Sequence, residues 1–93
     1  MNNYESIIIV KPCLEDVEIK KLKEKIQNLI KENGNLESIE DLGIKRLAYE
    51  IKKYKKGYYI IFNFESKTDF IVELERVFGI TEDIIKFIVV RKS

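Results

Sequence analysis

The feature that most limits the fold of this chain is the order of its apolar patterns, some with the spacing of a helix and others typical of a strand. Two segments, residues 16–33 and 70–78, repeat apolar residues every three or four positions, as one face of a helix does. Four other segments are β-branched, aromatic or alternating, which is typical of strands: residues 4–10, 36–51, 58–64 and 84–91. The sequence therefore predicts the order strand, helix, strand, strand, helix, strand.

This order leaves few ways to arrange the elements in space. Strand–helix–strand crossovers are right-handed, and two interleaved crossovers commonly give a ferredoxin-like sandwich. That α+β fold has a four-stranded antiparallel sheet in the order 4-1-3-2, with both helices on one face. Segments 4–10 and 58–64 are the most apolar strands, so we expect them in the centre of the sheet. With 93 residues and no linker-like stretch, the chain is predicted to be a single domain over residues 1–93.

Glycines and small polar residues predict where the elements end. Gly34 is expected to end the first helix in a left-handed conformation, and Gly43 is expected to mark a bulge within the second strand. Residues 52–56 are predicted to form a charged loop that turns at Gly57. The polar residues 66–69 offer side-chain oxygens that could cap the second helix.

Apolar side chains occur at both alternating sets of positions in several predicted strands. In the first strand, for example, Ile8 and Val10 alternate with Ile7 and Ile9. One set must face the helices, and the other set is left on the open face of the sheet. Because a large exposed apolar patch usually marks a contact surface, we expect a partner protein or an oligomer contact to cover it.

Positive charge is concentrated in one segment. Residues 44–57 contain six basic residues and one acidic residue, Glu50, which gives a net charge of +5. The rest of the chain carries eleven basic and fifteen acidic residues, which gives a net charge of −4. Like charges at this density repel one another and favour a polyanionic partner. The alternative is a lysine-rich hairpin whose charge serves only to keep the protein in solution.

The chain contains few of the residue types on which catalysis depends. It has no histidine, a single cysteine (Cys13) and four widely spaced glycines, so the sequence offers neither a zinc site nor a phosphate-binding loop. No apolar run approaches the roughly 18 residues that cross a bilayer. Residues 56–63 begin like an RNA-recognition octamer, but Ile60 stands where that motif needs a stacking aromatic. We therefore expect a non-enzymatic, intracellular protein without cofactor, metal, small-molecule substrate or membrane contact.

One segment resembles a known family signature. Residues 43–52, Gly-Ile-Lys-Arg-Leu-Ala-Tyr-Glu-Ile-Lys, are similar to the signature of the bacterial small-subunit ribosomal protein six family. In that family a glycine, a basic residue, Leu-Ala-Tyr and an isoleucine follow one another in this order. The resemblance extends to Tyr4 in the first strand, Pro12 before the first helix and Gly57 near the third strand. Glu50 departs from the pattern, because many members of the family have proline at that position.

The resemblance implies a structural protein of the small ribosomal subunit, in the cytoplasm or in an organelle with its own ribosomes. It implies binding to the central domain of the small-subunit ribosomal RNA, together with ribosomal protein eighteen as a heterodimer partner. The residues expected to contact RNA are Tyr4, Lys45, Arg46, Lys53, Lys86 and Arg91. Tyr49 is expected to be a core ring with its hydroxyl at the rim. The alternative function is that of a ligand-sensing or oligomerising ferredoxin-like domain that does not bind RNA.

Overall fold

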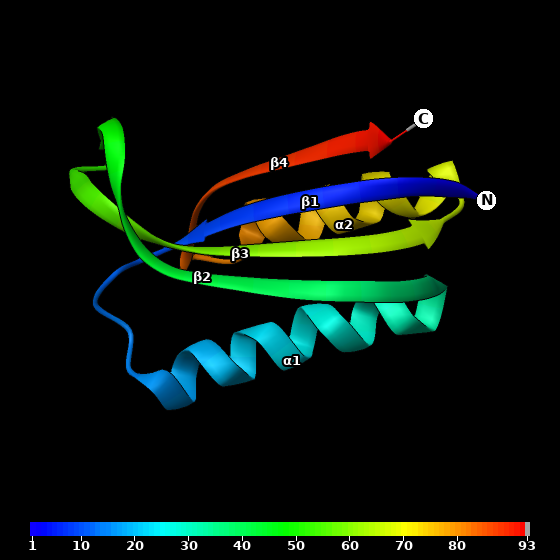
Figure 1. Cartoon of the computed structure of the whole chain (residues 1–93), viewed down its shortest axis with the longest axis horizontal. Helices are drawn as coiled ribbons and strands as arrows, with labels where there is room; N and C mark the ends of the chain where they lie inside the picture. The colour runs from blue at the N-terminus through cyan, green and yellow to red at the C-terminus, as the bar shows by residue number, and fades with distance from the viewer. Residues whose placement is uncertain (93) are drawn as a thin grey trace.

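The fold is a four-stranded antiparallel sheet covered on one face by two helices (Figure 1). The computed structural model describes residues 1–92. Its elements, in chain order, are β1 (Asn2–Val10), α1 (Asp16–Asn33), β2 (Gly34–Ile51), β3 (Tyr54–Ser66), α2 (Thr68–Ile80) and β4 (Ile84–Lys92). The strands lie in the order β2-β3-β1-β4, which confirms the predicted ferredoxin-like topology and places β1 and β3 in the centre.

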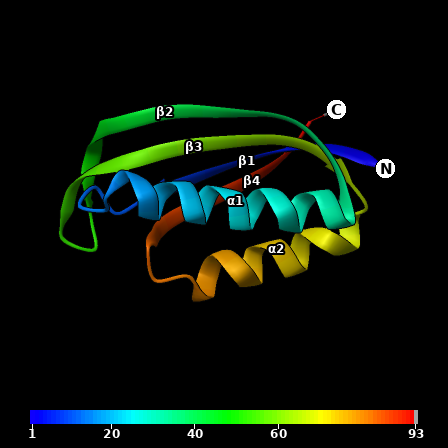
Figure 2. The ribbon, with the colours of Figure 1, turned by 90° about the horizontal axis from the view of Figure 1, so that it is seen from below.

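The two helices pack side by side against the same face of the sheet (Figure 2). Helix α1 buries Ile19, Leu22, Ile26 and Ile30, which are the apolar positions spaced at three and four residues. Its first turn carries a capping box in which Glu15 and Glu18 satisfy each other's backbone amides. None of the helices within residues 1–92 is both long and apolar enough to span a bilayer.

The main core lies between the helices and one alternating set of strand residues. On β1 this set includes Ile8 and Val10, and on β3 it includes Ile60, Phe62 and Phe64, all of them fully buried. Phe64 stacks on the ring of Tyr4 and packs edge to face against Phe70 of α2. The other alternating set faces away from the helices, so the sheet has an open face, as the sequence predicts.

The predicted charged loop over residues 52–56 is too long, and its turn is not at Gly57. The chain turns at Lys52 and Lys53, whose φ angles are 49° and 72°, and β3 begins at Tyr54. A two-residue turn with both φ angles positive matches the twist of a hairpin, and here lysines adopt it instead of glycine. Gly57 is therefore a strand residue, and a Cβ there would collide with the side chain of Ile9 on the adjacent β1 strand.

Two predicted helix ends also need correction. Gly34 does not adopt a left-handed conformation, because its φ is −179° and β2 starts at this residue. It is needed for space instead, since a Cβ would collide with the backbone oxygen of Glu65. Helix α2 starts after Lys67 without a hydrogen bond from a capping side chain, and it extends beyond the predicted segment 70–78 to Ile80. The predicted bulge at Gly43 is confirmed, with a φ of 73° and a shift in register.

Candidate nucleic-acid interface

The β2–β3 hairpin projects beyond one end of the sheet (Figure 1). Regular pairing between the two strands stops at Arg46 and Lys56 and resumes at Ile51 and Tyr54. Residues 47–50 therefore form a bulge that bends the hairpin. We call residues 44–57 the cationic hairpin.

All six basic side chains of the cationic hairpin are exposed: Lys45, Arg46, Lys52, Lys53, Lys55 and Lys56. The ion pairs found within residues 1–92 are Lys11–Asp83, Lys23–Asp41 and Arg76–Glu73, and none involves these six. The single acidic residue of the segment, Glu50, is also exposed and makes no ion pair there. The positive charge of the hairpin is therefore free to act on an external anion.

A small apolar cluster fixes the hairpin to the open face of the sheet. Leu47, in the bulge, is 7% exposed and packs with Ile9 of β1 and Ile85 of β4. Ile51 and Tyr54 pack against this cluster from the hairpin side. We call Ile9, Leu47 and Ile85 the open-face cluster. Because the buried Leu47 anchors the backbone of the bulge, the basic residues are presented on a fixed support rather than on a free loop.

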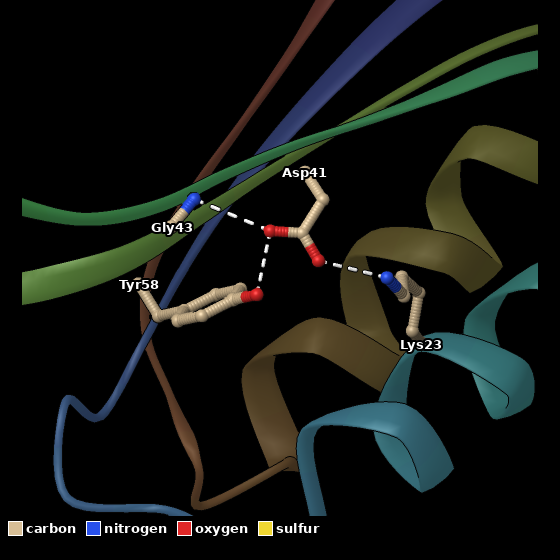
Figure 3. Close-up of polar contacts among 4 residues, drawn as sticks. All are labelled: Lys23, Asp41, Gly43 and Tyr58. Carbon is tan, nitrogen blue, oxygen red and sulfur yellow. Dashed lines mark hydrogen bonds and ion pairs between the residues drawn. The ribbon is translucent and has the colours of Figure 1, made fainter. Parts of the chain in front are cut away.

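The carboxylate of Asp41 ties the base of the hairpin to α1 (Figure 3). The hydroxyl of Tyr58 donates to Asp41 Oδ1 at 2.6 Å, and the backbone N–H of Gly43 donates to the same oxygen at 3.2 Å. The ammonium of Lys23 on α1 donates to Asp41 Oδ2 at 2.8 Å. The side chain of Asp41 thus connects three elements: the bulge at Gly43 in β2, the ring of Tyr58 in β3, and helix α1.

These contacts shift two acid–base equilibria. Partial burial acts to raise the pKa of Asp41, but the hydrogen bonds from Lys23 and Tyr58 outweigh it, so the pKa lies below 3.8. The hydrogen bond to Asp41 raises the pKa of Tyr58 to about 12. At neutral pH the carboxylate is therefore charged and the phenol neutral, which is the state that forms the hydrogen bonds.

Lys86 of β4 lies next to the cationic hairpin. Its ammonium donates to the hydroxyl of Tyr49 at 3.1 Å and lies 5.5 Å from the centre of that ring. Of the six residues predicted to contact RNA, four therefore come together at one end of the sheet: Lys45, Arg46, Lys53 and Lys86.

The other two predicted residues lie at the opposite end of the sheet, where β1 begins and β4 ends (Figure 1). Tyr4 and Arg91 are cross-strand neighbours on β1 and β4. The ring of Tyr4 is 5% exposed, and its hydroxyl donates to Thr68 Oγ1 at 3.4 Å. Arg91 donates to the side-chain oxygen of Asn2 at 2.9 Å. The structure therefore does not bring these two residues together with the hairpin.

Two features of the site escaped the sequence analysis. Tyr49 is 65% exposed, although its alternation with Leu47 and Ile51 predicted a core ring. The bulge at residues 47–50 breaks that alternation, and no sequence signal marked it. The Asp41 contacts were also missed, and the only hint was an aspartate two residues before the bulge glycine, where its side chain can accept from the backbone.

The described part of the chain, residues 1–92, contains no cluster of three or more metal-ligating side chains. What the hairpin offers is a set of exposed cationic donors on a fixed support. Arginine and lysine in this arrangement bind phosphates.

Comparison with known proteins identifies relatives along nearly the whole chain. The family model described as Ribosomal protein S6 matches residues 3–91. The small ribosomal subunit protein bS6 of Helicobacter acinonychis (strain Sheeba) is 45% identical over 92 residues, and its counterpart from Campylobacter lari (strain RM2100 / D67 / ATCC BAA-1060) is 40% identical over 92 residues. Each alignment covers 98% of this chain, but it covers 65% of the Helicobacter protein and 74% of the Campylobacter protein. The chain thus spans just under two-thirds of the length of its Helicobacter relative.

A solved structure agrees with this relationship. The crystal structure of 30S ribosomal protein S6 from Thermotoga maritima superposes with a TM-score of 0.93 at 31% sequence identity. The superposition covers 98% of this chain and 87% of that one. The family model and both relatives are described as ribosomal proteins. With a match that covers residues 3–91 and a shared fold, the chain belongs to the ribosomal protein S6 family.

Proposed function

We propose that this protein is a structural component of the small ribosomal subunit that binds the central domain of the small-subunit ribosomal RNA. The observation that carries the proposal is the cationic hairpin, whose six exposed basic side chains make no ion pair within residues 1–92. Family membership supports the same assignment, because the relatives are small ribosomal subunit proteins.

The hairpin would act on the RNA backbone rather than on base sequence. Lysine ammonium groups act as point charges on phosphates, and Arg46 can hold one phosphate through two parallel hydrogen bonds. Folded RNA has a deep, narrow major groove that side chains do not enter, so contacts of this kind follow the shape of the backbone. The proposed contacts are Lys45, Arg46, Lys53 and Lys86.

The terminal end of the sheet would contribute less to RNA binding. Arg91 is exposed but already donates to Asn2, so it would make at most a secondary contact with a second stretch of RNA. Tyr4 would contribute through packing, since its buried ring has no free face for a base. By this criterion Lys45, Arg46 and Lys53 are the most available of the six proposed residues, since Lys86 also makes a side-chain hydrogen bond, to Tyr49.

The proposed protein partner is ribosomal protein eighteen, on the open face of the sheet. Ile88 and Val90 on β4 are 45% and 46% exposed on that face, next to the half-buried Ile7 and Ile61 of the central strands. An apolar surface of this kind is stabilised when a partner covers it. Because it lies beside the hairpin, such a partner would extend the RNA-binding surface.

Filter binding to the transcribed central-domain RNA, with and without ribosomal protein eighteen, tests the proposal. The variant Lys45→Ala/Arg46→Ala should weaken binding and flatten its salt dependence, by roughly 0.7–0.9 in the log–log slope for each lost phosphate contact. The matched control is Lys20→Ala/Lys25→Ala, which removes two exposed positive charges from α1. An unchanged slope in the hairpin variant would refute these contacts. Failure of the wild type to retain RNA with the partner present would favour a domain that does not bind RNA.

A further inference from the structure

Tyr49 presents an aromatic ring at the centre of the cationic hairpin. Its side chain is 65% exposed, whereas the rings of Phe62 and Phe64 are fully buried in the core. Exposing so large an apolar ring forgoes burial energy, because an apolar side chain is more stable out of water. The position of Tyr49 therefore suggests a role other than packing.

The ring stands between two hollows. On the open face of the sheet it lines an apolar hollow of about 230 Å³ together with Ile9, Tyr59 and Ile88. It also lines a second hollow of about 240 Å³, which is lined by Arg46 and Lys55 as well. An aromatic surface and two cations are thus within reach of one bound group.

The contact with Lys86 leaves the faces of the ring accessible. The ammonium is 3.1 Å from the hydroxyl oxygen but 5.5 Å from the ring centre, so it lies towards the hydroxyl edge. This hydrogen bond fixes the direction of the ring and brings a third cation to its rim. The neighbouring residue in the bulge, Ala48, is too small to cover the ring.

The backbone on either side of the ring is held in place. Leu47 is buried in the open-face cluster, and Ile51 is paired with Tyr54 on β3. The ring is therefore presented in a defined position, which lowers the entropic cost of binding a planar ligand.

From this geometry we infer that Tyr49 stacks on the base of one unpaired nucleotide, with the phosphate of that nucleotide held by Arg46 and Lys55. The inference rests on the proposed RNA-binding function and assigns a single-stranded feature of the RNA to the hairpin. Proteins that bind unpaired nucleotides combine aromatic rings for the bases with cations for the backbone. Glu50 lines the same hollow, and its carboxylate repels a phosphate, so the attraction of the two cations must exceed that repulsion.

Two RNA probes and two variants test this inference. The first probe is a short oligouridine that carries one 2-aminopurine, a base whose fluorescence falls when it stacks on an aromatic ring. The second is a fully paired RNA duplex, to which only phosphate contacts contribute. Tyr49→Phe keeps the ring, whereas Tyr49→Leu keeps apolar bulk without it, and Val72→Ala on α2 is a control at an exposed apolar site remote from the hairpin.

The wild type and Tyr49→Phe should bind the oligouridine and quench its fluorescence, and Tyr49→Leu should bind it on the order of 5- to 100-fold more weakly. Duplex binding should be the same in the wild type, in both Tyr49 variants and in Val72→Ala. Equal oligouridine binding and equal quenching by Tyr49→Leu would overturn the inference, and so would loss of ribosomal protein eighteen binding alone. If Lys45→Ala/Arg46→Ala weakens binding of both probes while Tyr49→Leu weakens neither, the proposed function stands and only the stacking role fails.

Discussion

The two ends of the sheet carry similar side chains but differ in what those side chains contact. At the hairpin end, six exposed basic residues make no ion pair within the described chain, and the bulge beneath them is anchored by Leu47. At the terminal end, Arg91 donates to Asn2 and Lys92 donates to Asn63. The positive charges there are already engaged by side-chain oxygens of the protein.

This difference shows that a basic side chain can be present at the surface without being free to bind a phosphate. A cation that donates to a neighbouring side chain must give up that contact before it binds a phosphate, so its net gain in free energy is smaller. A cation repelled by its neighbours instead gains from an anion that relieves the repulsion. We therefore expect the hairpin end to dominate RNA binding, and four variants test this expectation.

The largest expected effect is on RNA affinity. Replacing Lys52, Lys53, Lys55 and Lys56 with glutamine should lower affinity for the central-domain RNA on the order of 100-fold or more at about 0.1 M salt. The counterpart variant, Arg91→Gln/Lys92→Gln, should have a much smaller effect and leave most of the salt dependence. Filter binding across a salt series measures both. If the terminal variant lost as much affinity per charge as the hairpin variant, the comparison would fail.

The next effect concerns the support of the hairpin. In Gly57→Ala the new Cβ would collide with a short branch of the buried Ile9 side chain, so the variant should lose about 1–3 kcal/mol in the free energy of unfolding. Gly79→Ala is the matched control, because nothing lies within 4 Å of a Cβ at that position on α2. It should be neutral or more stable by up to about 1 kcal/mol. Urea denaturation measures both, and similar losses in the two variants would contradict the close approach at Gly57.

A smaller effect is expected at the base of the hairpin. Asp41→Asn keeps the shape of the side chain but loses the ion pair with Lys23, so it should cost about 1–2 kcal/mol at pH 7. The pKa of Asp41 in the folded state lies below the value of 3.8 expected for the unfolded chain. Its carboxylate therefore stabilises the fold fully above pH 3.8, and this stabilisation is lost as the pH falls through the folded-state pKa. Urea denaturation should therefore show a difference in the free energy of unfolding between wild type and variant at pH 7, and a smaller difference at acid pH. A gap that stayed constant with pH would mean that the charge of Asp41 contributes nothing.

The smallest effect is expected at Tyr4. Tyr4→Phe removes a long hydrogen bond to Thr68 and leaves the buried ring in place, so stability should fall by less than about 1 kcal/mol. RNA affinity should not change, since the hydroxyl is not exposed as a free donor. A clear loss of RNA binding in this variant would restore Tyr4 to the interface.

Much of the fold could be predicted from the sequence because it depends on the spacing of apolar residues. The positions Ile19, Leu22, Ile26 and Ile30 specify one helical face, and all four are buried. The strand order follows from the order of the elements and the handedness of crossovers. The hairpin turn was misplaced because Lys52 and Lys53 adopt positive φ angles, which lysine rarely does.

The candidate site was predictable in its location but not in its details. The concentration of positive charge between residues 44 and 57 is a property of the sequence alone. The exposure of Tyr49 depends on the bulge at residues 47–50, which interrupts the regular pairing of β2 with β3 and leaves the ring 65% exposed. The separation of Arg91 from the hairpin depends on strand direction, and its engagement by Asn2 depends on contacts between the two ends of the chain.

The most direct test of the account is to follow the backbone amide signals of the protein by NMR while the central-domain RNA is added. The account predicts that the largest changes fall on residues 44–57 and around Lys86, with small changes near Tyr4 and Arg91. Changes concentrated at the terminal end of the sheet, or on the outer faces of α1 and α2, would contradict it.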